Sequence, residues 1–162
     1  MENTNQNKKR WRCVALVFLA LWLGTGGVFA ALFVRGQGRP SSDGRTAIAL
    51  TASEKDFVLM EMRRLLEAVH AIHGALATGK RSEAIEAARG AGMQMVREGA
   101  AAEQSLLLKL PADMKALGIA THRQFDRIRG LLQAGAPDAE VARATFDLTA
   151  RCVACHRTYR LQ

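Results

Sequence analysis

The sequence predicts an all-α protein: an antiparallel four-helix bundle with up-down-up-down topology, preceded by one N-terminal transmembrane helix. Three observations support this prediction. One long run of residues carries no charge, four later stretches place apolar residues at helical spacings, and no stretch shows the alternating pattern of a strand. The corresponding regions are a basic cytoplasmic N-terminus at 1–12, a transmembrane segment at 13–34, a linker at 35–50 and a helical domain at 51–162.

Residues 13–34 are the candidate membrane helix, because none of them is charged. At about 1.5 Å per residue this segment spans about 33 Å, enough to cross a bilayer core of about 30 Å. Lys8, Lys9, Arg10 and Arg12 stand just before it and hold that end in the cytoplasm. We therefore expect a single-pass protein of the bacterial cytoplasmic (inner) membrane, with the remaining residues in the periplasm.

A cleavable signal peptide is the alternative interpretation of the same segment. Val28, Phe29 and Ala30 fit a small-residue cleavage site, and the glycines within 24–27 fit the end of a short apolar core. The apolar run continues beyond that site to Val34, which favours an uncleaved anchor. Both interpretations export the domain that follows.

After the membrane segment the chain is mildly basic and its charges are mixed. From residue 35 onward it has 19 lysines and arginines against 14 aspartates and glutamates, a net charge of +5. The two signs alternate without a basic block, which is typical of solvated helix faces and argues against nucleic-acid binding. The excess positive charge favours an acidic protein partner. The oligomeric state stays open, and a dimer is compatible with the sequence.

The domain follows a spacer and begins with a well-marked helix. Residues 35–50 are rich in Gly, Ser and Arg, which predicts a flexible linker. Thr51 and Glu54 have the spacing of a capping box at a helix start. The first helix of the domain is expected to run from there to Thr78 and to end at Gly79.

Three further helices are predicted downstream. The second is expected over 82–108, although several glycines weaken it. Pro111 precedes the third, expected over 112–134. Gly135 ends that helix, and the fourth is expected over 138–160.

Apolar residues recur at spacings of three and four in three of these helices, which is the pattern of helices packed at about 20° in a bundle. The seams are Val58, Met62, Leu65, Val69, Ile72 and Leu76 in the first helix, Met114, Leu117, Thr121, Phe125, Ile128 and Leu132 in the third, and Val141, Thr145, Leu148, Cys152, Cys155 and Tyr159 in the fourth.

The fourth helix carries a Cys-x-x-Cys-His motif at Cys152, Cys155 and His156. This motif is the attachment signature of c-type haem. Two cysteines three residues apart lie on one face of a helix, where their thiols can each add to one haem vinyl group. The adjacent His156 then offers an imidazole nitrogen to the iron as the proximal ligand. The sequence therefore predicts one covalently attached haem c with its iron.

Other uses of the cysteines fit less well. A thioredoxin-like pair stands at a helix start in a fold that contains a sheet, whereas this pair lies late in a predicted helix. Zinc needs a fourth ligand, and no second Cys/His cluster occurs. A disulfide between residues one turn apart constrains little. Cys13, at the start of the membrane segment, is interpreted as an apolar filler.

The motif continues to Tyr159 and Arg160. A C-terminal Cys-x-x-Cys-His-x-x-Tyr-Arg at the end of four predicted helices resembles the class II c-type cytochromes. This family comprises cytochrome c prime and its methionine-ligated low-spin relatives. The resemblance implies a four-helix bundle over about 51–160, a haem c and single-electron transfer to redox partner proteins, without bond-forming catalysis. The predicted membrane anchor departs from the soluble members of that family.

The resemblance also implies that the distal side of the haem faces the first helix of the bundle. Met62 belongs to the inward seam of that helix, whereas Met60 lies about 200° away around it. Met62 is therefore the candidate distal iron ligand, with an ordinary core methionine as the alternative. His73 and His122 are competing candidates. Tyr159 and Arg160 are expected beside the haem, with Arg160 near a propionate.

The sequence thus predicts a membrane-tethered periplasmic monohaem cytochrome that moves single electrons. An apolar distal side would instead leave an open site for nitric oxide or carbon monoxide, as in a sensor or scavenger. A third alternative is a helical adaptor without haem.

Overall fold

The computed structural model describes residues 2–162, with the side chains of residues 2–6 and 100–103 outside the description. Most of the described chain is helical. The elements in order are α1 (Glu2–Arg35), β1 (Gly38–Pro40), β2 (Thr46–Ile48), α2 (Ala52–Ala77), α3 (Arg81–Ala91), α4 (Met93–Glu103), the 3₁₀ helix η1 (Gln104–Leu108), α5 (Ala112–Gln133), α6 (Asp138–Thr158) and β3 (Tyr159–Leu161).

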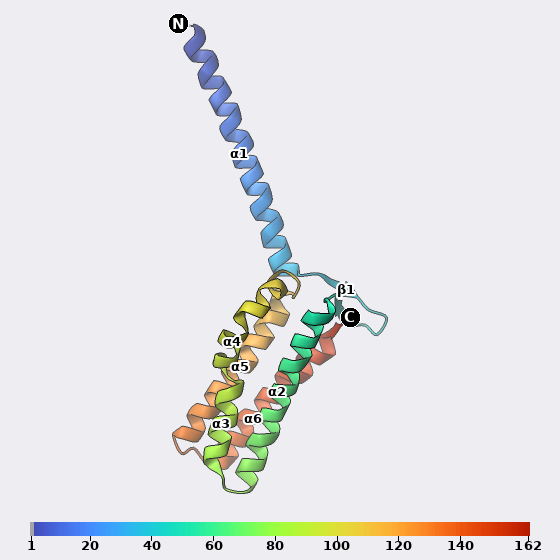
Figure 1. Ribbon diagram of the computed structural model, residues 1–162, viewed down its shortest axis with the longest axis vertical. Helices are drawn as coiled ribbons and strands as arrows, with labels where there is room; N and C mark the ends of the chain where they lie inside the picture. Colours follow the sequence, from blue (N-terminus) through green and yellow to red (C-terminus); the bar gives the residue numbers. More distant parts are fainter. Residues whose placement is uncertain (1) are drawn as a thin grey trace.

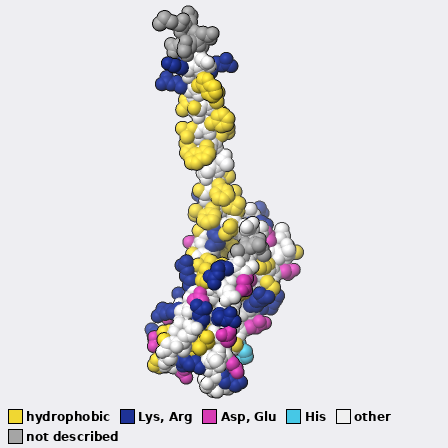
Figure 2. Space-filling model, turned by 60° about the vertical axis from the view of Figure 1, so that its left-hand side comes forward, with side chains coloured by type: hydrophobic (Ala, Val, Ile, Leu, Met, Phe, Trp, Pro, Cys, Tyr) yellow, Lys and Arg dark blue, Asp and Glu magenta, His cyan; other side chains and the backbone are white. Residues whose placement is uncertain are grey.

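Helix α1 projects away from the other helices (Figure 1). Its segment Asn7–Arg35 contains an 18-residue window with a mean hydropathy of 2.2 and is long and apolar enough to cross a membrane. Apolar side chains cover it, and lysines and arginines gather toward its outer end (Figure 2). The predicted N-terminal apolar helix is therefore present, and it extends beyond the predicted 13–34 at its N-terminal end.

The end of α1 is fastened to the domain. Lys115 Nζ of α5 donates a hydrogen bond to the Phe33 carbonyl at 2.6 Å and lies 3.6 Å from the centre of the Phe33 ring. The next turn uses Gly36 at a φ of 63°, which lets the backbone approach Lys109 closely. Gln37 N then donates to the Lys109 carbonyl at 2.8 Å. A side-chain hydrogen bond, a cation–π contact and a backbone hydrogen bond thus join this end of the chain segment to the domain.

The linker is not a flexible spacer throughout, and that prediction is wrong for residues 38–48. β1 pairs antiparallel with β2, and β2 pairs in parallel with β3, so that Ala47 lies opposite Arg160. Ala47 and Ile48 are buried, which gives the hairpin an apolar attachment to the domain. The expected absence of strands is therefore also wrong. Strands of three residues are too short to show an alternating pattern.

α2 runs away from α1, α3 and α4 follow one another back toward it, α5 runs away again and α6 returns (Figure 1). α2 packs on α3, α3 on α5, and α5 on α6, while α2 and α6 contact each other little. The predicted capping box of Thr51 and Glu54 is confirmed at the start of α2. α6 ends at Thr158 rather than 160, because the following residues turn into β3.

The predicted continuous second helix over 82–108 is wrong, because the chain breaks at Gly92 into α3 and α4 and ends in η1. Asp126 of α5 explains the break. Its carboxylate accepts a hydrogen bond from Met93 N at 3.0 Å and thus caps the start of α4. The carboxylate also lies where a side chain at position 92 would be, so that glycine is needed there.

The packed core fills only the end of the domain remote from α1. Four helices contribute to it, with seam residues inward as the periodicity predicts. Its fully or nearly fully buried members are Ala68, Ile72, Ala75, Ala84, Ala88, Ala91, Phe125, Ile128, Leu132, Val141, Ala144 and Leu148.

Candidate functional site

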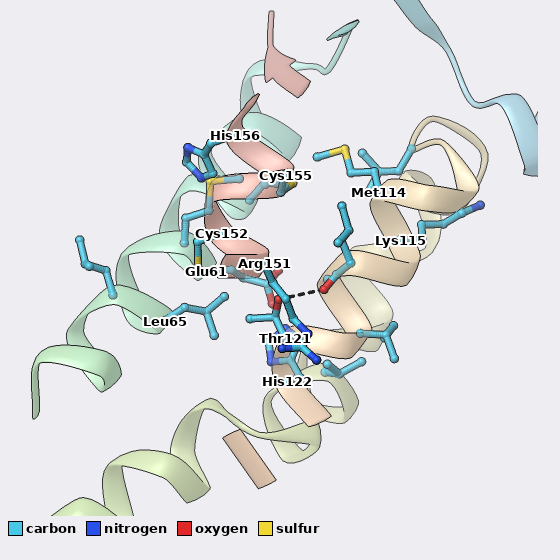
Figure 3. A pocket seen from close by; sticks show the side chains of 18 of the residues that line it. Glu61, Leu65, Met114, Lys115, Thr121, His122, Arg151, Cys152, Cys155 and His156 are labelled. Atoms are coloured by element: carbon cyan, nitrogen blue, oxygen red, sulfur yellow. Dashed lines mark hydrogen bonds between the residues drawn. The ribbon is translucent and has the colours of Figure 1, made fainter. Parts of the chain in front are cut away.

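The opposite end of the domain is hollow. A cavity of about 640 Å³ lies there between α2, α5 and α6 and is closed further by residues 106–110 (Figure 3). Most of its lining is apolar. The apolar lining residues are Val58, Leu59, Met62, Leu65, Leu66, Val69, Val96, Leu106, Leu107, Leu110, Met114, Leu117, Ile119 and Phe125.

α6 brings the three motif residues to this cavity. Cys152, Cys155 and His156 all belong to its lining, and neither cysteine is in a disulfide (Figure 3). Cys152 follows Leu148 by four positions, and Cys155 follows Cys152 by three. Both cysteines therefore continue the buried seam of α6. The seam thus changes along the helix from core contacts to cavity lining.

The surroundings of the two thiols keep them protonated. Burial raises the pKa of Cys152, and burial together with the proximity of Cys152 raises the pKa of Cys155. Cys152 is accessible nonetheless, because its exposed surface faces the cavity. A raised thiol pKa means that little thiolate forms at neutral pH, so that both groups are weak nucleophiles without activation.

Met62 faces the same cavity from α2, whereas Met60 does not line it. The assignment of these two methionines to different helix faces is therefore confirmed. His122 of α5 also lines the cavity, is buried, and has Nδ1 at 2.8 Å from the Ala91 carbonyl. His73 is exposed and lies outside the lining.

Three cationic side chains, Arg63, Lys115 and Arg151, and one acidic side chain, Glu61, belong to the cavity lining. Lys115 lines it near α1, where burial lowers the pKa of its ammonium group. Arg151 lines it one residue before the motif and donates from Nη1 to the Asp147 carbonyl at 2.8 Å. The cavity is therefore lined mostly by apolar residues, with a few charged side chains of both signs among them.

A smaller cavity of about 200 Å³ adjoins the first and shares Met62, Met114, Cys155 and His156 with it. Its other lining includes Arg45 from the hairpin. Tyr159 and Arg160 also line it, so that these two residues lie beside His156 as the motif suggests.

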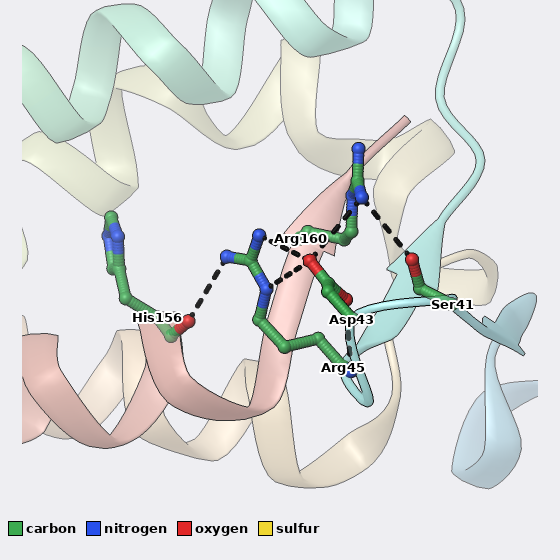
Figure 4. Close-up of polar contacts among 5 residues, drawn as sticks. All are labelled: Ser41, Asp43, Arg45, His156 and Arg160. Carbon is green, nitrogen blue, oxygen red and sulfur yellow. Dashed lines mark hydrogen bonds and ion pairs between the residues drawn. The ribbon is translucent and has the colours of Figure 1, made fainter.

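The turn of the hairpin forms a polar cluster over the end of α6 (Figure 4). Arg45 donates to Asp43 Oδ2 from Nε at 2.9 Å and from Nη2 at 2.7 Å, and from Nη1 to the His156 carbonyl at 3.3 Å. Arg160 Nη1 donates to Ser41 Oγ at 3.3 Å and pairs with Asp43 at 3.4 Å. The hydrogen bonds from the Arg45 side chain and backbone lower the pKa of Asp43 to about 2.

Sequence reasoning missed Ser41, Asp43 and Arg45 because they belong to the presumed spacer. The signal available for them was the Asp43-Gly44 pair, a frequent turn dipeptide, and Gly44 indeed has a φ of 80°. The contact of Arg45 with a residue 111 positions later has no local signal.

Among the described residues, no three side chains of the His, Cys, Asp and Glu types gather as a metal-binding group. The motif cysteines and His156 therefore have no such neighbour there to complete a protein-only zinc site. Comparison of the chain with protein-family models, with curated proteins and with solved structures gave no match.

Proposed function

We propose that this protein is a membrane-tethered periplasmic monohaem c-type cytochrome, with a four-helix-bundle haem domain that carries single electrons. One observation carries the proposal: Cys152, Cys155, His156 and Met62, chosen from the sequence, all line one cavity. These residues come from two helices, α2 and α6, that are far apart in the chain.

The cavity fits a haem in size and chemistry. Its volume of about 640 Å³ falls in the range of about 300–1,000 Å³ typical of cofactor pockets. Apolar walls would exclude water from the porphyrin, and Arg151 offers positive charge to its carboxylates.

The chain's own groups have distinct tasks in this proposal. Cys152 and Cys155 each add their S–H across one vinyl group, which forms two thioether bonds without oxidation or reduction. His156 would hold the iron through its imidazole, and Met62 would hold it through its thioether sulfur. When bound, the haem supplies the one-electron iron couple. Because the protein only binds and tunes it, we propose no bond-forming catalysis.

The membrane location rests on α1 and on the basic residues before it. The helix is long and apolar enough to cross the bilayer, and Lys8, Lys9, Arg10 and Arg12 favour a cytoplasmic N-terminus. The haem domain then lies in the periplasm, where its positive excess favours acidic redox partners.

A pyridine haemochrome spectrum of the purified full-length protein tests the proposal. We expect the bands of a haem with two thioether bonds, at one haem per chain. A protein that was co-expressed with a haem-attachment system and carries no covalent haem would contradict it.

The open-site haem protein remains the second candidate, because α2 also lines the cavity with the apolar side chains of Val58, Leu59 and Leu65. Without ligation by Met62, this wall would leave room for carbon monoxide or nitric oxide. Absorption spectra of the reduced protein with and without carbon monoxide distinguish the two: rapid binding favours the open site, and no binding favours the electron carrier.

A further inference from the structure

Within the hairpin turn, the side chain of Arg45 is hydrogen-bonded to a residue of the Cys-x-x-Cys-His motif, His156. Its target, the His156 carbonyl, is one of the last carbonyls of α6, and such groups lack a partner within the helix. Arg45 supplies the missing donor at 3.3 Å. It therefore fixes the main chain at the residue that offers the proximal imidazole.

Asp43 orients the guanidinium for this task. Two nitrogens of Arg45 bond to Asp43 Oδ2, which leaves Nη1 directed at His156 (Figure 4). The backbone N–H of Arg45 also donates to Asp43 Oδ1 at 3.1 Å. A turn closed by Ser41 N bonding to the Arg45 carbonyl at 2.8 Å holds both residues. The two charges are thus held in place from several sides.

These charges lie beside the proximal ligand and are partly shielded from solvent. Arg45 lines the smaller cavity together with Cys155 and His156. The side chains of Arg45 and Asp43 are 36% and 35% exposed, so that about two thirds of each is covered by protein. Salt in the solvent therefore screens them less than it screens a fully exposed charge.

We propose that Arg45 is a positioning residue for the proximal ligand and that the Arg45–Asp43 pair sets the reduction potential of the haem. This inference rests on the proposed function. Ferric haem carries one more positive charge than ferrous haem, so that a nearby positive charge favours the ferrous state and raises the potential. A nearby negative charge lowers it. Arg45 and Asp43 exert these opposite influences next to His156, and Arg160 adds a second positive charge beside Asp43.

Opposite shifts in two variants test the inference. Arg45→Gln removes one positive charge from the cluster, in which Arg160 still pairs with Asp43, and lowers the potential of the full-length protein. Asp43→Asn removes its negative charge and raises the potential. Spectroelectrochemical titration in detergent at pH 7 measures both. Arg157→Gln is the matched control: it removes the same charge one residue from His156 but at an exposed position, and it produces a smaller shift than Arg45→Gln.

Three results would each overturn the inference. Potential shifts of equal sign in Arg45→Gln and Asp43→Asn, or no shift in either, would point to a structural disturbance or to no role of the pair. A shift in Arg157→Gln as large as in Arg45→Gln would mean that the net charge accounts for the data. Haem staining of the same samples separates this failure from failure of the proposed function. Haem-loaded variants with unmoved potentials reject only the role of the pair, whereas wild-type protein without covalent haem rejects the proposed function.

Discussion

Met62 and His156 lie on different helices, α2 and α6, and both line the large cavity and the smaller one beside it. They therefore border the same space from two sides. Met60, two positions earlier on α2, lines neither cavity. This relationship makes the distal ligand directly testable.

Met62→Ala opens the distal side of the haem. We expect the iron to change from low-spin to high-spin, carbon monoxide to bind rapidly, and the reduction potential to fall, because thioether ligation favours ferrous iron. Absorption spectra and redox titration measure these changes. Met60→Ala is the control and keeps the wild-type spectrum. A low-spin Met62→Ala protein would instead point to His122, the histidine that lines the cavity.

In the proposed cytochrome, each of the two motif thiols accounts for one covalent bond to the haem. Cys152→Ala and Cys155→Ala each lose normal attachment through two thioethers, and the double variant loses covalent haem altogether. Haem-stained denaturing gels and mass spectrometry measure this. Cys13→Ala, which changes an exposed cysteine of α1, keeps the full stain. Wild-type staining of the double variant would exclude the motif as the attachment site.

The domain without haem is expected to be unevenly stable. The core of Ile72, Phe125 and Leu148 is packed without any cofactor, whereas the cavity end depends on a ligand that binds only the native state. In the double cysteine variant, hydrogen exchange of residues 54–66 and 149–158 is therefore faster than that of residues 125–148. Equal protection at both ends would show that the cavity end is stable when empty.

Glu54 makes stability depend on acidity. Hydrogen bonds from Lys109, at 2.6 Å, and from Thr51 lower its pKa from 4.5 to about 2. The stabilisation by this group is complete above pH 4.5 and is lost as the pH falls toward 2. Glu54→Gln removes about 1 kcal/mol at pH 7 and flattens the pH dependence between 2 and 4.5.

Urea unfolding monitored by circular dichroism, with haem content held constant, measures this effect. Glu67→Gln, at an exposed position of the same helix, serves as the control and keeps the wild-type dependence. A Glu54→Gln protein as stable as the wild type at pH 7 would assign no energetic role to the contact with Lys109.

The native protein is expected to fractionate with the cytoplasmic membrane and to keep residues 13–34. Their length and lack of charge provide the reason. Replacing this segment with a cleavable signal peptide should release a soluble, haem-loaded domain into the periplasm. Native protein that begins at Ala31 by N-terminal sequencing would establish the signal peptide instead.

Features with a local cause were predictable from the sequence. The capping box at Thr51, the ends of α5, and the inward faces of α2, α5 and α6 all follow from residues a few positions apart. The same periodicity placed Met62 rather than Met60 at the cavity.

Features with a distant cause were not predictable. The break at Gly92 depends on Asp126 of another helix, and the strand at 46–48 depends on residues more than a hundred positions later. Lys115 reaches back to Phe33 in the same way. Such contacts leave no periodic pattern in the segment they organise.

The parallel pairing of β2 with β3 has a consequence for the order of assembly. Ribosomes complete residues 46–48 long before residues 159–161, so that the hairpin waits for its third strand through nearly the whole synthesis of the domain. Contacts of such high sequence separation slow folding, because a large loop must close first. The third strand begins three residues after His156. In the proposed cytochrome, the third strand and the motif thiols would therefore be complete at almost the same point of synthesis, and a strand that docked before haem attachment would restrict access to the same end of α6.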